Sequence, residues 1–243
     1  MNRKNFTKGL YISFILFVIN SQLFAEKIIF SANSMSGKTG DSSSTTELKG
    51  NSYILTETIE INADNITLSG DDYRFIDASG KVKGKNLETK MEFSADTLNF
   101  DRTTKIAKLI GNVELIDTEN SVKANAQRIE YNQDKEIAIL QIEVNLTQKE
   151  NECTGAYAIY YKKQQVLELS GNAQVKQKKD TFRAQNIYFN MDTEEIKLGG
   201  NVKGSVTDTK ESKEKESVQQ NITDSKDTKK QENKMTNSEN QKD

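Results

Sequence analysis

Hydrophobic and polar residues alternate in short stretches along most of the chain. Between residues 107 and 115, the apolar side chains of Ala107, Leu109, Val113 and Leu115 share one parity, and polar residues fill most of the other. This period of two predicts a half-buried β-strand, and a helical period does not fit it. Because the parity continues through Gly111, we expect the Gly-Asn pair there to bend one strand rather than to reverse the chain.

The Gly-Asn pair is part of a repeat. It recurs at residues 50–51, 171–172 and 200–201, each time inside a stretch that combines apolar and polar positions. One such pair would be weak evidence because it is also a common hairpin turn. Its recurrence indicates an array of similar units, each with a bend at the same place.

A second motif lies upstream of each Gly-Asn position and consists of an alanine followed by large apolar residues. Phe93 and Ala95 are in phase, whereas Leu98 and Phe100 have the opposite parity, which predicts a bulge within one strand. A polar turn such as "DRTT" then follows. The motif alanines lie 28 to 32 residues apart and define six units: Ala32, Ala63, Ala95, Ala126, Ala156 and Ala184.

Two bent strands per unit, joined by short polar turns, predict an all-β fold. One hairpin cannot bury its apolar face alone, so the units are expected to stack into two facing sheets. The sequence therefore predicts an elongated antiparallel β-jelly roll of about six repeated bent-strand hairpin units over residues 26–204. No helical pattern interrupts it.

The two ends of the chain differ from this region. Residues 1–25 combine basic residues, an apolar run from Leu10 to Ile19 and a small residue at Ala25, which predicts a cleaved signal peptide and export. A retained membrane anchor is the alternative, although the apolar run is short for a span. Residues 205–243 are charged and poor in apolar residues, which predicts a disordered polar tail.

Composition argues against several classes of function. The chain has no His and one Cys, so the commonest metal ligands and the usual general base are missing. Acidic pairs such as Asp71–Asp72 fall in expected turns, and the single thiol, Cys153, is interpreted as a structural residue. A net charge of −2 gives no argument for nucleic acid. We expect no enzyme activity, no cofactor and no metal.

The repeated motifs resemble a known family. The sequences "INAD", "FSAD" and "FRAQ", followed by an apolar pair, a turn and then "IGNVEL" or "GGNVKG", are similar to the OstA-like superfamily. Its members include the lipopolysaccharide transport proteins LptA and LptC and the N-terminal domain of LptD. The resemblance covers residues 27–204 and implies a twisted β-jelly roll, open at its ends.

The resemblance also implies a function. The protein would be a periplasmic carrier or bridge that binds the acyl chains of lipopolysaccharide, or of a related glycolipid, and passes it from the inner to the outer membrane. Its implied partners are LptC-like inner-membrane and LptD-like outer-membrane proteins, and end-to-end homo-oligomers are possible. Two alternatives stay open: a periplasmic scaffold that pairs its edge strands with proteins and carries no lipid, and an LptC-like anchored component.

The in-phase apolar residues are the candidate lipid-binding positions. They would line a trench wide enough for hydrocarbon, and an interior filled by side chains would argue against this role. Sequence does not separate lining residues from packed core. The candidates are Ala95, Leu98, Phe100, Leu109, Val113, Leu115, Ala126, Ile129, Tyr131, Leu140, Val144, Leu146, Ile159, Tyr161, Leu169, Ile187, Phe189 and Leu198.

Overall fold

The computed structural model describes residues 27–38 and 45–207. The predicted signal peptide and most of the predicted tail lie outside these residues. A short 3₁₀ turn, η1 (Asp71–Tyr73), accompanies the strands β1 (Ile29–Ser31), β2 (Ser34–Lys38), β3 (Thr45–Leu55), β4 (Ile59–Ser69), β5 (Phe75–Asn86), β6 (Met91–Asp101), β7 (Ile106–Asp117), β8 (Val122–Asn132), β9 (Ile137–Gln148), β10 (Asn151–Tyr161), β11 (Val166–Gln177), β12 (Asp180–Asn190), β13 (Ile196–Gly199) and β14 (Lys203–Ser205).

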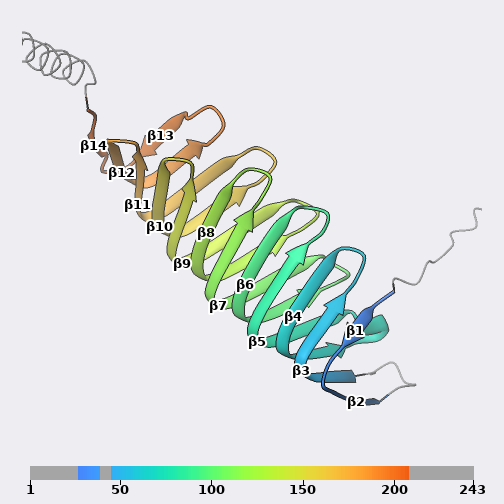
Figure 1. Ribbon diagram of the computed structural model, residues 1–243. Helices are drawn as coiled ribbons and strands as arrows, with labels where there is room; N and C mark the ends of the chain where they lie inside the picture. Colours follow the sequence, from blue (N-terminus) through green and yellow to red (C-terminus); the bar gives the residue numbers. More distant parts are fainter. Residues whose placement is uncertain (1–26, 39–44, 208–243) are drawn as a thin grey trace, which may run out of the picture.

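The strands form one long antiparallel sheet in which sequence neighbours pair with each other. From β3 to β12, each strand is hydrogen-bonded to the strand before it and the strand after it. The sheet folds over along its whole length, so the molecule is an elongated stack of bent hairpins (Figure 1). The predicted fold class, an all-β jelly roll built from repeated hairpins, is confirmed.

Every second strand is creased by two adjacent residues with positive φ. At Gly111 and Asn112 these angles are 81° and 46°, and β7 continues on both sides of the pair. The Gly-Asn motif is therefore a bend within a strand, as predicted. A side chain at Gly111 would also collide with Asp96, because an added Cβ would lie 2.2 Å from the Oδ2 atom. The six creases are at residues 50–51, 80–81, 111–112, 142–143, 171–172 and 200–201.

One crease lacks the glycine that the others contain. In β9 the two positions are Ile142 (φ 67°) and Glu143 (φ 56°), and the Ile142 side chain is 58% exposed. A β-branched residue is disfavoured at such angles because its Cβ approaches the backbone. Since β9 still bends there, the neighbouring strands and their ladders determine the crease, and Ile142 adopts the conformation at a cost.

The alanine motif marks a break in register on the intervening strands, as predicted. In β6 the pairing with β7 shifts between Ser94 and Thr97, and buried residues change parity there. In β10, however, Gly155 occupies the place that alanine has elsewhere, and Ala156 is exposed. The predicted unit at Ala156 was therefore out of register by one residue.

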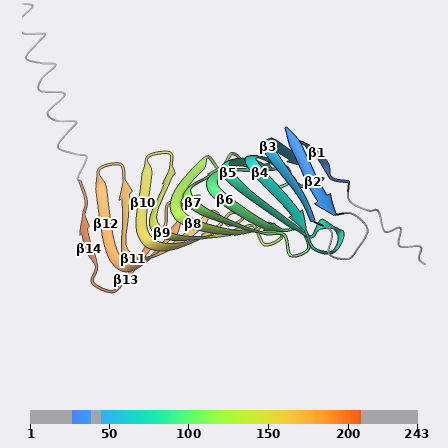
Figure 2. The same cartoon turned by 90° about the horizontal axis from the view of Figure 1, so that it is seen from below.

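The crease divides the sheet into two arms, and Figure 2 shows the bent strands from below. The strand ends form two rows of turns, which we call the first lip and the second lip. Asn86, Asp101 and Asp117 each accept hydrogen bonds from backbone N–H groups two and three residues later, which shapes the turns. The first lip comprises residues 56–58, 87–90, 118–121, 149–150 and 178–179, and the second comprises 70–74, 102–105, 133–136, 162–165 and 191–195.

Both ends of the stack finish in split strands. At one end, β1 and β2 pair with the two arms of β3, and at the other, β13 and β14 pair with the two arms of β12. Ile29, Phe30 and Met35 are exposed at the first end, and Val202 is exposed at the second. Each end therefore presents one short strand edge for each arm.

The crease geometry predicts opposite effects for two substitutions. Ile142→Gly is expected to raise the free energy of unfolding by about 1 kcal/mol. Glycine removes the strain of a β-branched residue at positive φ, and this gain exceeds the additional chain entropy that glycine loses on folding. Gly111→Ala is expected to lower it by about 1–2 kcal/mol or more, because it adds that strain and the contact with Asp96. Urea unfolding measures both.

Gly199→Ala is the matched control. Its added Cβ would meet only the Asn186 carbonyl oxygen, at 3.9 Å, so the substitution is expected to be neutral or slightly stabilising. Destabilisation of Ile142→Gly, or equal losses for the two alanine variants, would contradict the role assigned to the creases.

Candidate functional site

The inner faces of the two arms form one continuous apolar interior. Its buried side chains extend from Leu48 in β3 to Met191 after β12 and belong to a single cluster. The cluster runs along the stack because the period-2 pattern places alternate residues of every strand on the inner face. The interior is therefore the candidate site for an apolar ligand.

Most predicted lining residues lie on this inner face. Leu198 is only half-buried because it lies in β13, the last strand of its arm, at the open end of the stack. The buried ones are Ala95, Leu98, Phe100, Leu109, Val113, Leu115, Ala126, Ile129, Tyr131, Leu140, Val144, Leu146, Leu169, Ile187 and Phe189.

Two predicted residues, Ile159 and Tyr161, face the other way. In the part of β10 that leads to the second lip, Ala158 and Tyr160 are the buried residues. Ile159 and Tyr161 alternate with them and therefore face outward. Ile159 lies in a hollow of about 480 Å³ on the outer face, together with Tyr157 and Tyr188. The error follows from taking Ala156 instead of Gly155 as the repeat position.

The interior also includes residues that were not among the predicted lining residues. Leu48, Ile54, Ile61 and Ile76 are buried in β3, β4 and β5, the strands preceding the units from which candidates were drawn. Their alternation follows the same parity rule, so drawing candidates from the units at Ala32 and Ala63 as well would have found them.

The interior is packed in this conformation. Side chains of the two arms meet, and a void lined by Phe93, Phe100 and Tyr131 has a volume of about 10 Å³. That volume is close to what one water molecule needs. The expected trench is thus filled here by side chains, and a hydrocarbon chain would have to displace them.

The two lips close against each other through side chains. Gln133 of the second lip donates to Glu88 of the first, and Gln148 beside the first lip contacts Gln165 of the second at 3.4 Å. Gln133 and Gln148 are buried although they are polar. We call this line of contacts the seam.

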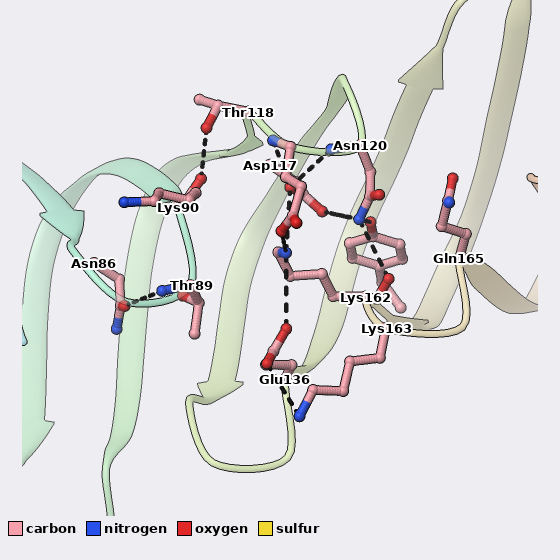
Figure 3. A network of polar contacts seen from close by, with 12 residues as sticks. Asn86, Thr89, Lys90, Asp117, Thr118, Asn120, Glu136, Lys162, Lys163 and Gln165 are labelled. Carbon is pink, nitrogen blue, oxygen red and sulfur yellow. Dashed lines mark hydrogen bonds and ion pairs between the residues drawn. The ribbon is translucent and has the colours of Figure 1, made fainter.

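A lysine lies at the centre of the seam. The Lys162 ammonium of the second lip pairs with Glu119 of the first lip and lies 3.8 Å from Asp117 Oδ1 at the end of β7. It also lies 3.7 Å from Glu136 in its own lip. The side chain of Lys162 is 3% exposed, and that of Asp117 is 1% exposed. Figure 3 shows Asp117, Glu136 and Lys162 converging between the turns.

Hydrogen bonds satisfy the buried Asp117 carboxylate. The Tyr160 hydroxyl donates to Oδ2 over 2.7 Å, and the Asn120 side-chain amide donates to the same atom over 2.7 Å. Asn120 also donates to the Lys162 carbonyl oxygen at 3.3 Å, so it joins both lips. Buried charges persist only where such partners replace water.

The ionisation states follow from this arrangement. Burial acts to lower the pKa of Lys162, but the hydrogen bond to Glu119 and the charges of Asp117 and Glu136 outweigh it and raise that pKa. Burial, and then the hydrogen bond to Asp117, raise the pKa of Tyr160 far above its usual value. At neutral pH, Lys162 is therefore a cation and Tyr160 a neutral donor.

These seam residues were not among the residues predicted from the sequence. Asp117, Gln133 and Gln148 each follow an inward-facing residue by two positions and continue its parity. Lys162 likewise follows Tyr160 by two, but the predicted register placed Tyr161 instead of Tyr160 in the inward row, so this continuation was not recognised. A polar residue at the end of an inward row is the signal that marks the seam.

Cys153 lies inside the interior, on the first-lip arm of β10. Burial raises the pKa of its thiol to about 12, so the reactive thiolate is rare at neutral pH. Among the described residues, no group of acidic residues and cysteine is arranged to hold a metal ion, and no helix has the length and apolar character to cross a membrane.

Comparison with known proteins shows similarity to a family model and to solved structures. A family model described as LptA/(LptD N-terminal domain) LPS transport protein matches residues 31–137, 116–166 and 136–195. The structure is similar to the crystal structure of LptH, the LptA homologous periplasmic component of the conserved lipopolysaccharide transport device from Pseudomonas aeruginosa, with 18% sequence identity and a TM-score of 0.47. The alignment covers 50% of this chain and 97% of that one. No curated protein matches the sequence.

The revised orientation of β10 predicts different costs for two chemically identical substitutions. Ile129→Ala is expected to lower the free energy of unfolding by about 2–5 kcal/mol because it opens a cavity in the packed interior. Ile159→Ala, on the outer face, is expected to cost less than about 1.5 kcal/mol. Equal losses in urea unfolding would place both side chains in the same environment and contradict the assignment.

The burial of the single thiol predicts slow chemical modification. Native protein is expected to react with a thiol reagent such as DTNB at least about 100-fold more slowly than unfolded protein at pH 8, because the reagent reaches Cys153 only when the interior opens. Absorbance at 412 nm follows the reaction. Rapid stoichiometric labelling of folded protein would show that the interior is open to solvent.

Proposed function

Because the chain belongs to the family of lipopolysaccharide transport proteins that comprises LptA and the N-terminal domain of LptD, we propose that it is a periplasmic carrier for lipopolysaccharide. In this proposal the acyl chains lie between the two arms while the lipid passes from the inner to the outer membrane. The continuous apolar interior from β3 to β12 is the observation that supports it.

The energetics of the lipid require such an interior. Each buried CH₂ group is worth about 0.8 kcal/mol, so one acyl chain of about 12–14 carbons costs on the order of 10 kcal/mol to expose to water. A glycolipid with several chains does not cross an aqueous compartment unaided. The inner faces of the arms offer apolar surface on both sides, and the inward alanines, such as Ala95 and Ala126, limit how much must be displaced.

The ends of the stack suit transfer between proteins. Unpaired strand edges are the part of a sheet that accepts another strand, and both ends of this one present short exposed edges. We propose that LptC-like and LptD-like proteins, or further copies of this chain, pair there. A scaffold that uses these edges without carrying lipid is the competing function, and the test must separate the two.

Photo-crosslinking separates them. With a benzophenone amino acid at Phe100 or Leu140, the protein is expected to form covalent adducts with lipopolysaccharide during incubation or expression, because both positions face the interior. The same probe at Ile159 or Tyr161, on the outer face, is the matched control and is expected to give few lipid adducts. Immunoblots for lipopolysaccharide and mass spectrometry of the adduct provide the readout.

Two outcomes would decide against the carrier. Adducts to proteins alone, together with an absence of lipid in organic extracts of the purified protein, would favour the scaffold. Equal lipid labelling from inner and outer positions would indicate nonspecific adsorption. The mature N-terminus, read by mass spectrometry, tests export separately: Glu26 is expected as the first residue if the signal peptide is cleaved.

A further inference from the structure

The seam is the boundary of the interior that can separate without breaking a β-ladder. Within the described chain, backbone hydrogen bonds between turns join turns of the same lip, such as Thr118 with Lys90 or Lys162 with Glu136. The contacts that join the first lip to the second each involve a side chain: Gln133 to Glu88, Tyr160 to Asp117, Lys162 to Glu119, Asn120 to the Lys162 carbonyl oxygen and Gln148 to Gln165.

The chemistry of the seam suits reversible closure. If the lips met through apolar side chains, their separation would expose hydrocarbon to water. Ions such as Lys162 and Asp117 instead regain hydration when they separate, which offsets the loss of their contact. A buried ion pair therefore holds the lips in one register while contributing little net stability. Its partner Glu119 is 64% exposed, so water reaches one end of the pair in the closed state.

The shape of an amphiphile favours entry through the seam. A glycolipid with a bulky hydrated headgroup cannot thread lengthwise through a packed interior without burying that headgroup. A slit between the lips allows the chains to lie inside while the headgroup stays in water. Because the void near Phe93 and Phe100 has only about the volume that one water molecule needs, such entry also requires the arms to move apart.

We propose that the Lys162 cluster is a latch: its cross-lip contacts with Asp117, Glu119 and Asn120 keep the interior closed, and their release lets acyl chains enter sideways between the lips. This inference rests on the proposed carrier function for the identity of the ligand. The opening itself does not depend on lipid and can be measured without it.

Cys153 supplies the lipid-free readout, since it faces the interior. Glu119→Gln is expected to increase the rate of DTNB labelling of the folded protein about three- to tenfold, the range for loss of a charge-assisted contact with a partly exposed partner. The matched control is Asp134→Asn. Asp134 is 62% exposed and pairs with Lys105 at 3.2 Å within the second lip, so its loss is expected to change the rate less than about twofold.

The dependence of labelling on urea separates opening of the seam from unfolding. Opening of the lips exposes little surface compared with unfolding, so the rate at low urea is expected to be nearly constant. A rate that rises as steeply as global unfolding, or equal rates for Glu119→Gln, Asp134→Asn and the unsubstituted protein, would overturn the latch. Urea midpoints confirm that the compared variants are folded.

A cleavable cross-link tests the route of entry. In a Cys153→Ser background, Glu88→Cys and Gln133→Cys place thiols on opposite lips, and a bis-maleimide with an internal disulfide joins them. Locked protein is expected to take up no lipopolysaccharide, and reduction of the linker is expected to restore uptake. The same cysteines capped with N-ethylmaleimide control for modification itself.

The outcomes distinguish the two hypotheses. Uptake by locked protein equal to that of capped protein would overturn the latch but leave the carrier intact. Absence of uptake by locked, reduced and unmodified protein alike would overturn the proposed function, and the thiol-labelling rates would still decide whether the Lys162 cluster controls opening.

Discussion

A pair of residues in the left-handed region, repeated in every second strand, is the constraint on which this architecture depends. Without it, consecutive antiparallel hairpins would form a single twisted sheet with one face on water. The crease folds each hairpin onto itself, so both arms bury the same face and a core forms within a sheet that has only sequential pairings. The ladder hydrogen bonds on both sides of the crease hold even Ile142 in this conformation.

The arrangement places opposite physical demands on two sides of the interior. At the crease, the backbone is continuous, and the arms cannot separate. At the lips, turns meet through hydrogen bonds and ion pairs of side chains, and the buried polar residues Asp117, Gln133, Gln148 and Lys162 gather there. The molecule is therefore hinged along one long side and closed by polar contacts along the other, which combines a dry core with a boundary able to open.

Local sequence patterns predicted the fold because the fold is local. Each strand pairs with its sequence neighbours, so alternation, Gly-Asn pairs and the alanine motif carried enough information for the strands, the bends and the bulges. The predicted register was wrong in β10, where a glycine occupies the position that alanine has in the other units. Gly155 replaced the expected alanine, Ala156 beside it looked like the motif, and the parity of Ile159 and Tyr161 was reversed.

The packing of the interior and the seam could not be read from the sequence in the same way. Alternation identifies the inward residues but not how far apart the arms stand, because that distance depends on contacts between strands remote from the crease. Lys162 lies in a turn of charged and amide residues, where an exposed side chain is the usual outcome. Its burial depends on Asp117 and Tyr160, which lie on different strands and meet only when the lips close.

The number of repeats also determines the length of the molecule. Neighbouring strands stand about 4.8 Å apart, so each hairpin unit lengthens the stack by about 10 Å, and six units extend about 60 Å. Strand length sets the depth of the arms independently of this number. Gain or loss of one unit would therefore change the length of the stack while leaving the cross-section of its interior unaltered.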